Sequence, residues 1–253
     1  MAKALSVYGD YSLAECITFE RILREGDTAI DAGASIGVFT LVMARACGPK
    51  GKVLAFEPQL PIFELLRQNL ELNGIENVQA RRCALSSNCH QRYVPNINIA
   101  RPGNMGAIGT ADTQADGLVP VTTISIDDLG LDACDLVKID TEGHESQVLD
   151  GGWRTIEDYR PWISLEMDRL QDSYDWFHRL QELKYDMYFY YPLIIHNGNF
   201  KGVPADDVPR IVSSNIICFP RTRRPIDMVV QVYKITSEEQ IVETVSRLKV
   251  APL

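Results

Sequence analysis

The stretch Thr28-Ala29-Ile30-Asp31-Ala32-Gly33-Ala34-Ser35-Ile36-Gly37 decides the fold. Its first residues form a short apolar run that ends in an acidic residue, a pattern typical of a buried strand. Gly33 and Gly37 allow a tight turn and a close approach of the backbone to another group. Residues 38–46 have the apolar density of a largely buried helix, which Gly48-Pro49 ends. The stretch therefore predicts a strand, a glycine loop and a helix.

The same alternation continues along the chain. Further strands are predicted at 52–57, 78–84, 136–140, 162–166, 185–191 and 215–219, and further helices at 61–72 and 173–183. Strands that alternate with helices predict an α/β fold, a doubly wound, mostly parallel sheet with helices on both faces. In such a sheet the carboxyl ends of the strands share one edge, and ligands bind there.

We predict one domain over residues 1–253, because no linker or internal repeat divides the chain. Two segments lie outside the alternating pattern. Residues 86–122 are rich in Asn, Gly and Pro and are longer than a simple connection. Residues 225–253 contain Ser237-Glu238-Glu239-Gln240, which predicts the start of a short helix. We interpret the first segment as an insertion and the second as a C-terminal appendage.

The charge, the apolar stretches and the cysteines of the chain limit which partners and which compartment we expect. The 253 residues carry 25 Lys and Arg against 34 Asp and Glu, a formal net charge of −9. A protein this acidic repels phosphate backbones, so nucleic acid is not an expected partner. No apolar stretch reaches the roughly 20 residues of a spanning helix, so no membrane partner is expected. The six cysteines form no C-x-x-C pair, which favours a reduced, cytoplasmic protein.

An acidic residue at the end of the second strand points to the ligand. Glu57 follows Gly37 by twenty positions, and there it can accept hydrogen bonds from both hydroxyls of a ribose. A carboxylate at Asp31 would repel a phosphate but suits a cationic, amino-acid-like group. The loop reads G-x-x-x-G rather than the G-x-G-x-x-G of dinucleotide sites. These features favour S-adenosylmethionine as the cofactor.

Three alternatives stay open at this point. The glycines can simply shape a strand–helix turn, with Glu57 a solvated strand end. A nicotinamide-dependent oxidoreductase on a similar sheet is the second, although it predicts a third glycine and a less acidic loop. A non-catalytic binding module that retains the fold is the third, and it predicts the loss of the glycine loop or of the acidic strand end.

The chain resembles the FkbM-type S-adenosylmethionine-dependent methyltransferases over roughly residues 15–220. The similar segments are 25–37, Phe56-Glu57-Pro58, 69–74, 137–145 and 163–166, of which Lys138-Ile139-Asp140-Thr141-Glu142-Gly143-His144-Glu145 is the most specific to the family. His144 departs from the family, which more often has a small residue there. The resemblance implies a seven-stranded class I methyltransferase sheet and methyl transfer, usually to an oxygen.

The resemblance also implies roles for individual residues around the cofactor. It places Asp31, Gly33, Ser35 and Gly37 beside the methionine and ribose portion, and Glu57, with Pro58 next to it, at the ribose hydroxyls. The turn containing Ala84 would flank the adenine. Asp140 would face the methionine ammonium or the transferring methyl, and Asn104 would reach the cofactor from above. The implied acceptor is a small molecule with a free hydroxyl, such as a sugar or secondary metabolite, beside the 86–122 insertion.

Catalysis by such an enzyme needs a base near the acceptor hydroxyl. The candidates near the ends of the fourth and fifth strands are Asp140, Glu142, His144 and Glu166. Glu145 shares a helix face with Glu142 if the helix begins at once, and stabilising a helix N-terminus is its alternative role. His196, in a polar loop, is a further imidazole that is more often solvated than catalytic. Clustered carboxylates also suit Mg²⁺, but no spaced ligand set predicts a metal.

Overall fold

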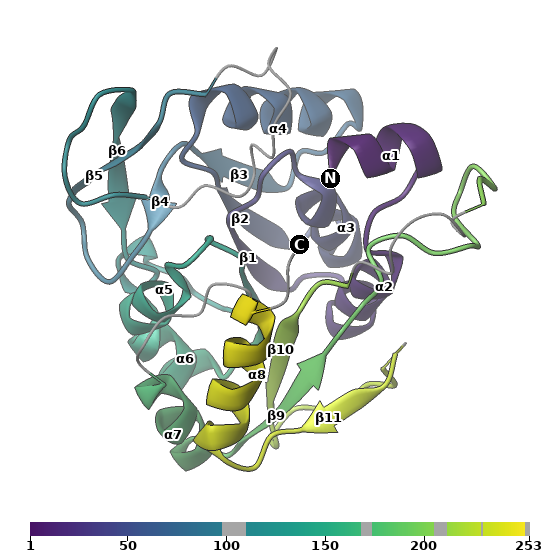
Figure 1. The fold of residues 1–253 in the computed structure, drawn as a ribbon, viewed down its shortest axis with the longest axis vertical. Helices are drawn as coiled ribbons and strands as arrows, with labels where there is room; N and C mark the ends of the chain where they lie inside the picture. The colour runs from purple at the N-terminus through teal and green to yellow at the C-terminus, as the bar shows by residue number, and fades with distance from the viewer. Residues whose placement is uncertain (98–109, 168–173, 205–211, 229, 251–253) are drawn as a thin grey trace.

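The computed structural model describes residues 1–97, 110–167, 174–204, 212–228 and 230–250, and Figure 1 shows their fold. The main sheet contains β1 (Thr28–Ala32), β2 (Lys52–Phe56), β3 (Val78–Arg81), β7 (Leu136–Ile139), β8 (Trp162–Glu166), β9 (Tyr185–Tyr190), β10 (Asn215–Pro220) and β11 (Val232–Lys234). Their order is β11-β9-β10-β8-β7-β1-β2-β3. The neighbours from β8 to β3 pair in parallel, and β10 is antiparallel to both β8 and β9.

The predicted α/β class with a mostly parallel sheet is confirmed, and two details differ. The described main sheet has eight strands rather than seven, because β11 of the C-terminal segment pairs with β9. The third strand was predicted to reach Ala84 but ends at Arg81. There the Cys83 N–H donates to the Arg81 carbonyl at 3.0 Å, which turns the chain out of the sheet.

Helices cover both faces of the sheet (Figure 1). One face carries α2 (Leu13–Ile22), α3 (Val38–Cys47) and α4 (Leu60–Leu72), and the other carries α5 (Glu145–Gly151), α6 (Trp153–Tyr159), α7 (Asp175–Glu182) and α8 (Glu238–Val250). The sequence pattern did not predict α2 or the preceding α1 (Ala2–Tyr8). None of the described helices combines the length and the apolar character needed to cross a membrane.

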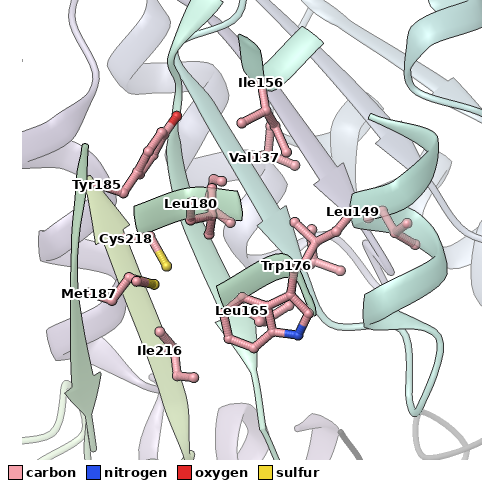
Figure 2. Packing of buried hydrophobic residues seen from close by; sticks show 14 of the residues in the cluster. Val137, Leu149, Ile156, Leu165, Trp176, Leu180, Tyr185, Met187, Ile216 and Cys218 are labelled. Atoms are coloured by element: carbon pink, nitrogen blue, oxygen red, sulfur yellow. The ribbon is translucent and has the colours of Figure 1, made fainter. Parts of the chain in front are cut away.

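The larger core lies between the sheet and α5 to α8. Figure 2 shows side chains of the central strands meeting those of the helices there, among them Val137, Leu165 and Leu180. The smaller cores lie on the other face, under α2, α3 and α4. Because the central parallel strands are buried on both faces, they read as nearly continuous apolar runs. A polar side chain within such a strand therefore marks a special site.

A second, three-stranded sheet with the order β4-β6-β5 lies to the left of the main sheet in Figure 1. It consists of β4 (Ala84–Leu85), β5 (Gln91–Pro95) and β6 (Leu118–Ile124), followed by the short helix η1 (Asp127–Leu129). Most of it belongs to the predicted insertion at 86–122. Ala111 pairs with Tyr93 of β5 through two backbone hydrogen bonds of 2.8 and 2.9 Å, which hold the chain around residue 111 against this sheet.

Candidate functional site

A row of buried polar side chains crosses the apolar centre of the main sheet. Asp31 of β1 is paired in register with Lys138 of β7, which is paired with Ser164 of β8. All three side chains are buried, with exposed fractions of 0%, 3% and 2%. Asp31 and Lys138 lie one residue before the carboxyl ends of their strands, the edge at which open α/β sheets bind ligands.

The Lys138 ammonium joins the polar groups of this edge. Its Nζ lies 3.2 Å from Asp31 Oδ1 and 3.3 Å from Asp140 Oδ2, and it donates to the Gly33 carbonyl at 3.4 Å. Burial opposes the charge, but the carboxylates of Asp31 and Asp140 outweigh it and raise the pKa of Lys138. The Thr40 hydroxyl donates to the second Asp31 oxygen at 2.6 Å. Two acidic residues predicted to bind the cofactor therefore share one buried cation.

The glycine loop packs directly on the chain after β7. Gly33 has φ +80°, and a Cβ placed there would lie 1.8 Å from the Asp140 carbonyl oxygen. Gly37 has φ +93°, and a Cβ there would lie 2.6 Å from Leu66 Cδ1 of α4. The backbone contact excludes any side chain at Gly33, whereas at Gly37 the end of the Leu66 side chain would have to shift and the positive φ itself favours glycine. The loop also brings the Ser35 N–H to the end of β2.

The Glu57 carboxylate receives that N–H. Its Oε2 accepts from Ser35 at 3.0 Å and its Oε1 from Gln59 at 2.9 Å. Glu57 is 7% exposed, and burial raises its pKa to about 7 against the two hydrogen bonds. Its acceptor atoms are thus fixed between the glycine loop and β2, with half-buried Pro58 next to them. Glu57 is therefore a buried, hydrogen-bonded acid and not a solvated strand end.

A cluster of carboxylates lies at the ends of β7 and β8. One oxygen from each of Asp140, Glu142 and Glu166 falls within 4.8 Å of the others, and all three residues are partly exposed. Hard oxygen ligands in such a group can hold a divalent cation such as Mg²⁺. The Lys138 ammonium beside Asp140 already neutralises part of their charge. The structure therefore brings together three of the four residues predicted to be catalytic.

Glu145 has a structural role. Its carboxylate accepts the N–H of Thr141 at 3.0 Å and the N–H of Gly143 at 3.0 and 3.1 Å. Helix α5 begins at Glu145, while Glu142 precedes it with φ +56°. The expectation that Glu142 and Glu145 share a helix face is therefore wrong. The reason is that Glu145 folds back to satisfy the N–H groups ahead of the helix.

The remaining predicted residues lie around this edge or outside the described part of the chain. His144 precedes α5, and its Nε2 lies 2.9 Å from Thr110 Oγ1. Ala84 is buried at the start of β4. His196 Nε2 lies 3.5 Å from the carboxylate of Asp10, and Asp10 belongs to the connection between α1 and α2. Asn104 lies outside the described residues.

Two groups near the site were missed by the sequence reasoning. Lys138 carries a signal, a cation within an otherwise apolar strand. Glu15 of α2 is 4% exposed and accepts from the Ser12 hydroxyl at 3.1 Å. Burial raises the pKa of Glu15 to about 7, although the charge of Lys138 lowers it. Glu15, Thr18, Phe19 and Ile22 form the buried side of α2 at helical spacing, which is the pattern that could have found it.

Known proteins share this architecture and sequence. The family model described as the methyltransferase FkbM domain matches residues 31–190. The chain is 34% identical over 157 residues to methyltransferase sdnD of Sordaria araneosa, which covers 48% of this chain and 59% of that protein. It is 32% identical over 132 residues to the hexuronic acid methyltransferase AglP of Haloferax volcanii, which covers 51% of each.

These matches span only part of each relative, between half and three fifths of its length. Among solved structures, the methyltransferase FkbM of Methylobacillus flagellatus superposes with a TM-score of 0.51 at 17% identity, over 81% of this chain and 50% of that one. This likeness concerns the fold alone. Since the family model matches more than half of the residues, the chain belongs to the FkbM methyltransferase domain family.

Proposed function

We propose that this protein is an S-adenosylmethionine-dependent methyltransferase that methylates an oxygen, most simply the hydroxyl of a sugar or secondary metabolite. The observation that carries the proposal is the shared edge of β1, β2 and β7. There a buried Glu57 with fixed acceptor atoms lies next to a glycine loop and to the Asp31–Lys138–Asp140 cluster. The names of two relatives, a hexuronic acid methyltransferase and methyltransferase sdnD, support this class of reaction.

The charges at this edge fit the cofactor. Asp31 and Asp140 share the single ammonium of Lys138, and Glu57 and Glu15 add two buried acids nearby. Such an edge favours a ligand with a sulfonium and an ammonium over one with a pyrophosphate. Glu57 would accept the ribose hydroxyls with Pro58 beside them, and Asp31 and Asp140 would face the methionine end. The backbone of the loop from Gly33 through Ser35 to Gly37 would line the methionine and ribose portion of the cofactor, and Ala84 would flank the adenine.

Bound S-adenosylmethionine supplies a methyl group that is already activated by its sulfonium. The protein then has to align the acceptor oxygen and take up its proton in a site that excludes water. Asp140, Glu142 and Glu166 are the groups that we propose for the proton, because their oxygens meet at the ends of β7 and β8. A base within hydrogen-bond reach typically contributes ~10²–10⁴ in rate.

Calorimetry with S-adenosylmethionine, S-adenosylhomocysteine and NAD tests the cofactor. We expect the first two ligands to bind and NAD not to bind. Tight binding of NAD alone would support the oxidoreductase alternative, and binding of none of the three would support a non-catalytic module.

Transfer of a labelled methyl group to a panel of acceptors tests the reaction. The panel contains neutral sugars, hexuronic acids and hydroxylated polyketides. Label that resists mild alkali indicates a methyl ether, whereas label released by alkali indicates a methyl ester of a carboxylate. Glu166→Gln tests the base: with an acceptor that the unchanged protein methylates, we expect this variant to bind the cofactor and to transfer the methyl group ~10²–10⁴ more slowly.

A further inference from the structure

The imidazole of His144 is held by a chain of side chains from the small sheet. Its Nε2 lies 2.9 Å from Thr110 Oγ1. The same hydroxyl oxygen accepts from Arg92 Nε at 2.6 Å, and the Thr110 carbonyl accepts from Arg92 Nη2 at 3.3 Å. Arg92 Nη1 forms an ion pair with Asp112. The insertion is therefore connected to the N-terminus of α5 through one continuous polar chain.

The chain starts from a charged side chain that is largely buried. Arg92 of β5 is 8% exposed although it is charged, and charged side chains are rarely buried without partners. Thr110 directly precedes Ala111, whose backbone is paired with Tyr93 of β5 by two hydrogen bonds. Backbone pairing of Ala111 with Tyr93 therefore holds Thr110 beside Arg92, and the 2.9 Å contact of Thr110 Oγ1 with Nε2 places His144 next to them.

The contacts favour one arrangement of the protons in this chain. A guanidinium only donates, so the Thr110 oxygen acts as an acceptor toward Arg92. The threonine hydroxyl keeps one hydrogen of its own, and in the described contacts His144 Nε2 is the acceptor toward which it can point. If the hydroxyl points there, Nε2 carries no hydrogen, and the single ring proton of a neutral imidazole lies on Nδ1.

The electrostatic environment agrees with a neutral ring. Burial lowers the pKa of His144, and the positive charge of Arg92 lowers it further. The carboxylate of Asp112 raises the pKa of His144, but Asp112 is exposed and paired with Arg92. His90 lowers this pKa to a smaller extent. Burial and the charge of Arg92 both oppose a charged ring.

We propose that Arg92 and Thr110 are positioning residues that hold His144 as the Nδ1–H tautomer, so that His144 serves the site as a hydrogen-bond donor and not as the base. The proposal rests on the proposed function for the ligand it serves, an acceptor atom of the cofactor or substrate near the loop after Asp140. It revises the catalytic role predicted for His144, because Nε2 is already used and Nδ1 carries a proton. The base function then falls to the carboxylates.

Ring-nitrogen NMR of the intact protein tests the tautomer independently of any activity. Long-range ¹H–¹⁵N correlation spectra of ¹⁵N-histidine protein at pH 8 report which nitrogen of each of the four imidazoles is protonated. We expect an Nδ1–H pattern for His144, assigned by its loss in His144→Asn. In Thr110→Val we expect this pattern to shift toward the Nε2–H tautomer or a mixture. An Nε2–H pattern in the unchanged protein, or no change in Thr110→Val, would overturn the proposal.

Two substitutions of His144 separate a donor from a base. The side-chain amide of Asn can place a donor where Nδ1–H lies, whereas Gln places its amide nearer to Nε2. We expect methyl transfer to fall less than tenfold in His144→Asn, with an unchanged pH profile, and to fall further in His144→Gln. The matched control is His178→Asn, at an exposed position of α7.

A base would behave differently. Both substitutions would then lower the rate by ~10²–10⁴, and the acidic limb of the pH profile would disappear in His144→Asn. That result would overturn the proposal. If the unchanged protein shows no methyl transfer to any acceptor, the proposed function fails while the NMR experiment still decides the tautomer.

Discussion

Replacement of Glu57 by Gln removes one charge from the centre of the proposed cofactor site while keeping the size of the side chain. In the unchanged protein the two carboxylate oxygens accept from the backbone N–H groups of Ser35 and Gln59, at 3.0 and 2.9 Å. The amide of Gln has one acceptor oxygen, and its NH₂ group must face the other N–H. Glu57→Gln therefore leaves one buried donor unpaired and weakens any ribose contact.

The magnitude follows from these hydrogen bonds. An unpaired buried donor costs roughly 1–3 kcal/mol of stability. Hydrogen bonds to a charged group are worth about 1.5–3 kcal/mol, so the affinity for S-adenosylmethionine should fall roughly 10- to 150-fold. We expect the loss of affinity in calorimetric titration of Glu57→Gln, whereas in thermal unfolding the cost of the unpaired donor is offset by the removal of a buried charge.

The raised pKa of Glu57 predicts opposite effects of rising pH on stability and on cofactor affinity. Burial raises the pKa of Glu57 to about 7 from an ordinary 4.5. A carboxyl group whose pKa is higher in the folded protein than in the unfolded chain stabilises the fold at a pH below the pKa of the unfolded chain. This stabilisation is lost as the pH rises from about 4.5 to 7. In the proposed placement the ionised carboxylate accepts the ribose hydroxyls, so affinity should rise with pH through about 7. Because burial also raises the pKa of Glu15 to about 7, the relevant quantity is the difference between the unchanged protein and Glu57→Gln.

Glu64→Gln is the matched control, since Glu64 is half-exposed on α4 and forms only a 3.7 Å pair with Arg67. It should bind the cofactor like the unchanged protein. An affinity within twofold of the unchanged protein in folded Glu57→Gln, or an equal loss in Glu64→Gln, would refute the placement of the ribose.

Two further substitutions test the cluster at this edge. Lys138→Met leaves Asp31 and Asp140 without their shared cation, and because breaking a buried ion pair costs about 3–5 kcal/mol, Tm should fall by roughly 6–20 °C. An unchanged Tm would mean that the carboxylates find other partners. Gly33→Ala places a Cβ 1.8 Å from the Asp140 carbonyl oxygen at a φ of +80°, so the two loops must separate and cofactor affinity should fall more than tenfold. Retention of full affinity, measured by the same titration, would contradict the tight contact between the loops.

Local patterns were sufficient to predict the class of the fold and the sheet edge at which the candidate site is proposed. Apolar runs, glycines and acidic strand ends are read from neighbouring residues, and parallel strands necessarily bring their carboxyl ends to one edge. Strand periodicity therefore predicts that Asp31, Glu57 and Asp140 lie along the same edge of the sheet. The family resemblance then added the expected cofactor and the roles of individual residues.

The partners of those residues could not be predicted in this way. Lys138 reaches Gly33 across 105 positions of sequence, and Thr110 reaches His144 across 34. Such pairs depend on which strands become neighbours and on how a short insertion folds, neither of which has a local periodic signal. The same holds for α2, whose buried Glu15 approaches Lys138 from outside the matched family domain.

The sequence by itself determined the α/β class, the glycine loop and the acidic edge, because period and spacing act over a few residues. Tertiary structure alone decided the charge state of that edge. It placed one lysine between two aspartates. It also turned Glu145 back onto the chain ahead of its helix and paired the three-residue strand β11 with β9 at the edge of the sheet. Each of these outcomes depends on burial and on contacts between distant segments, which set how strongly charges interact.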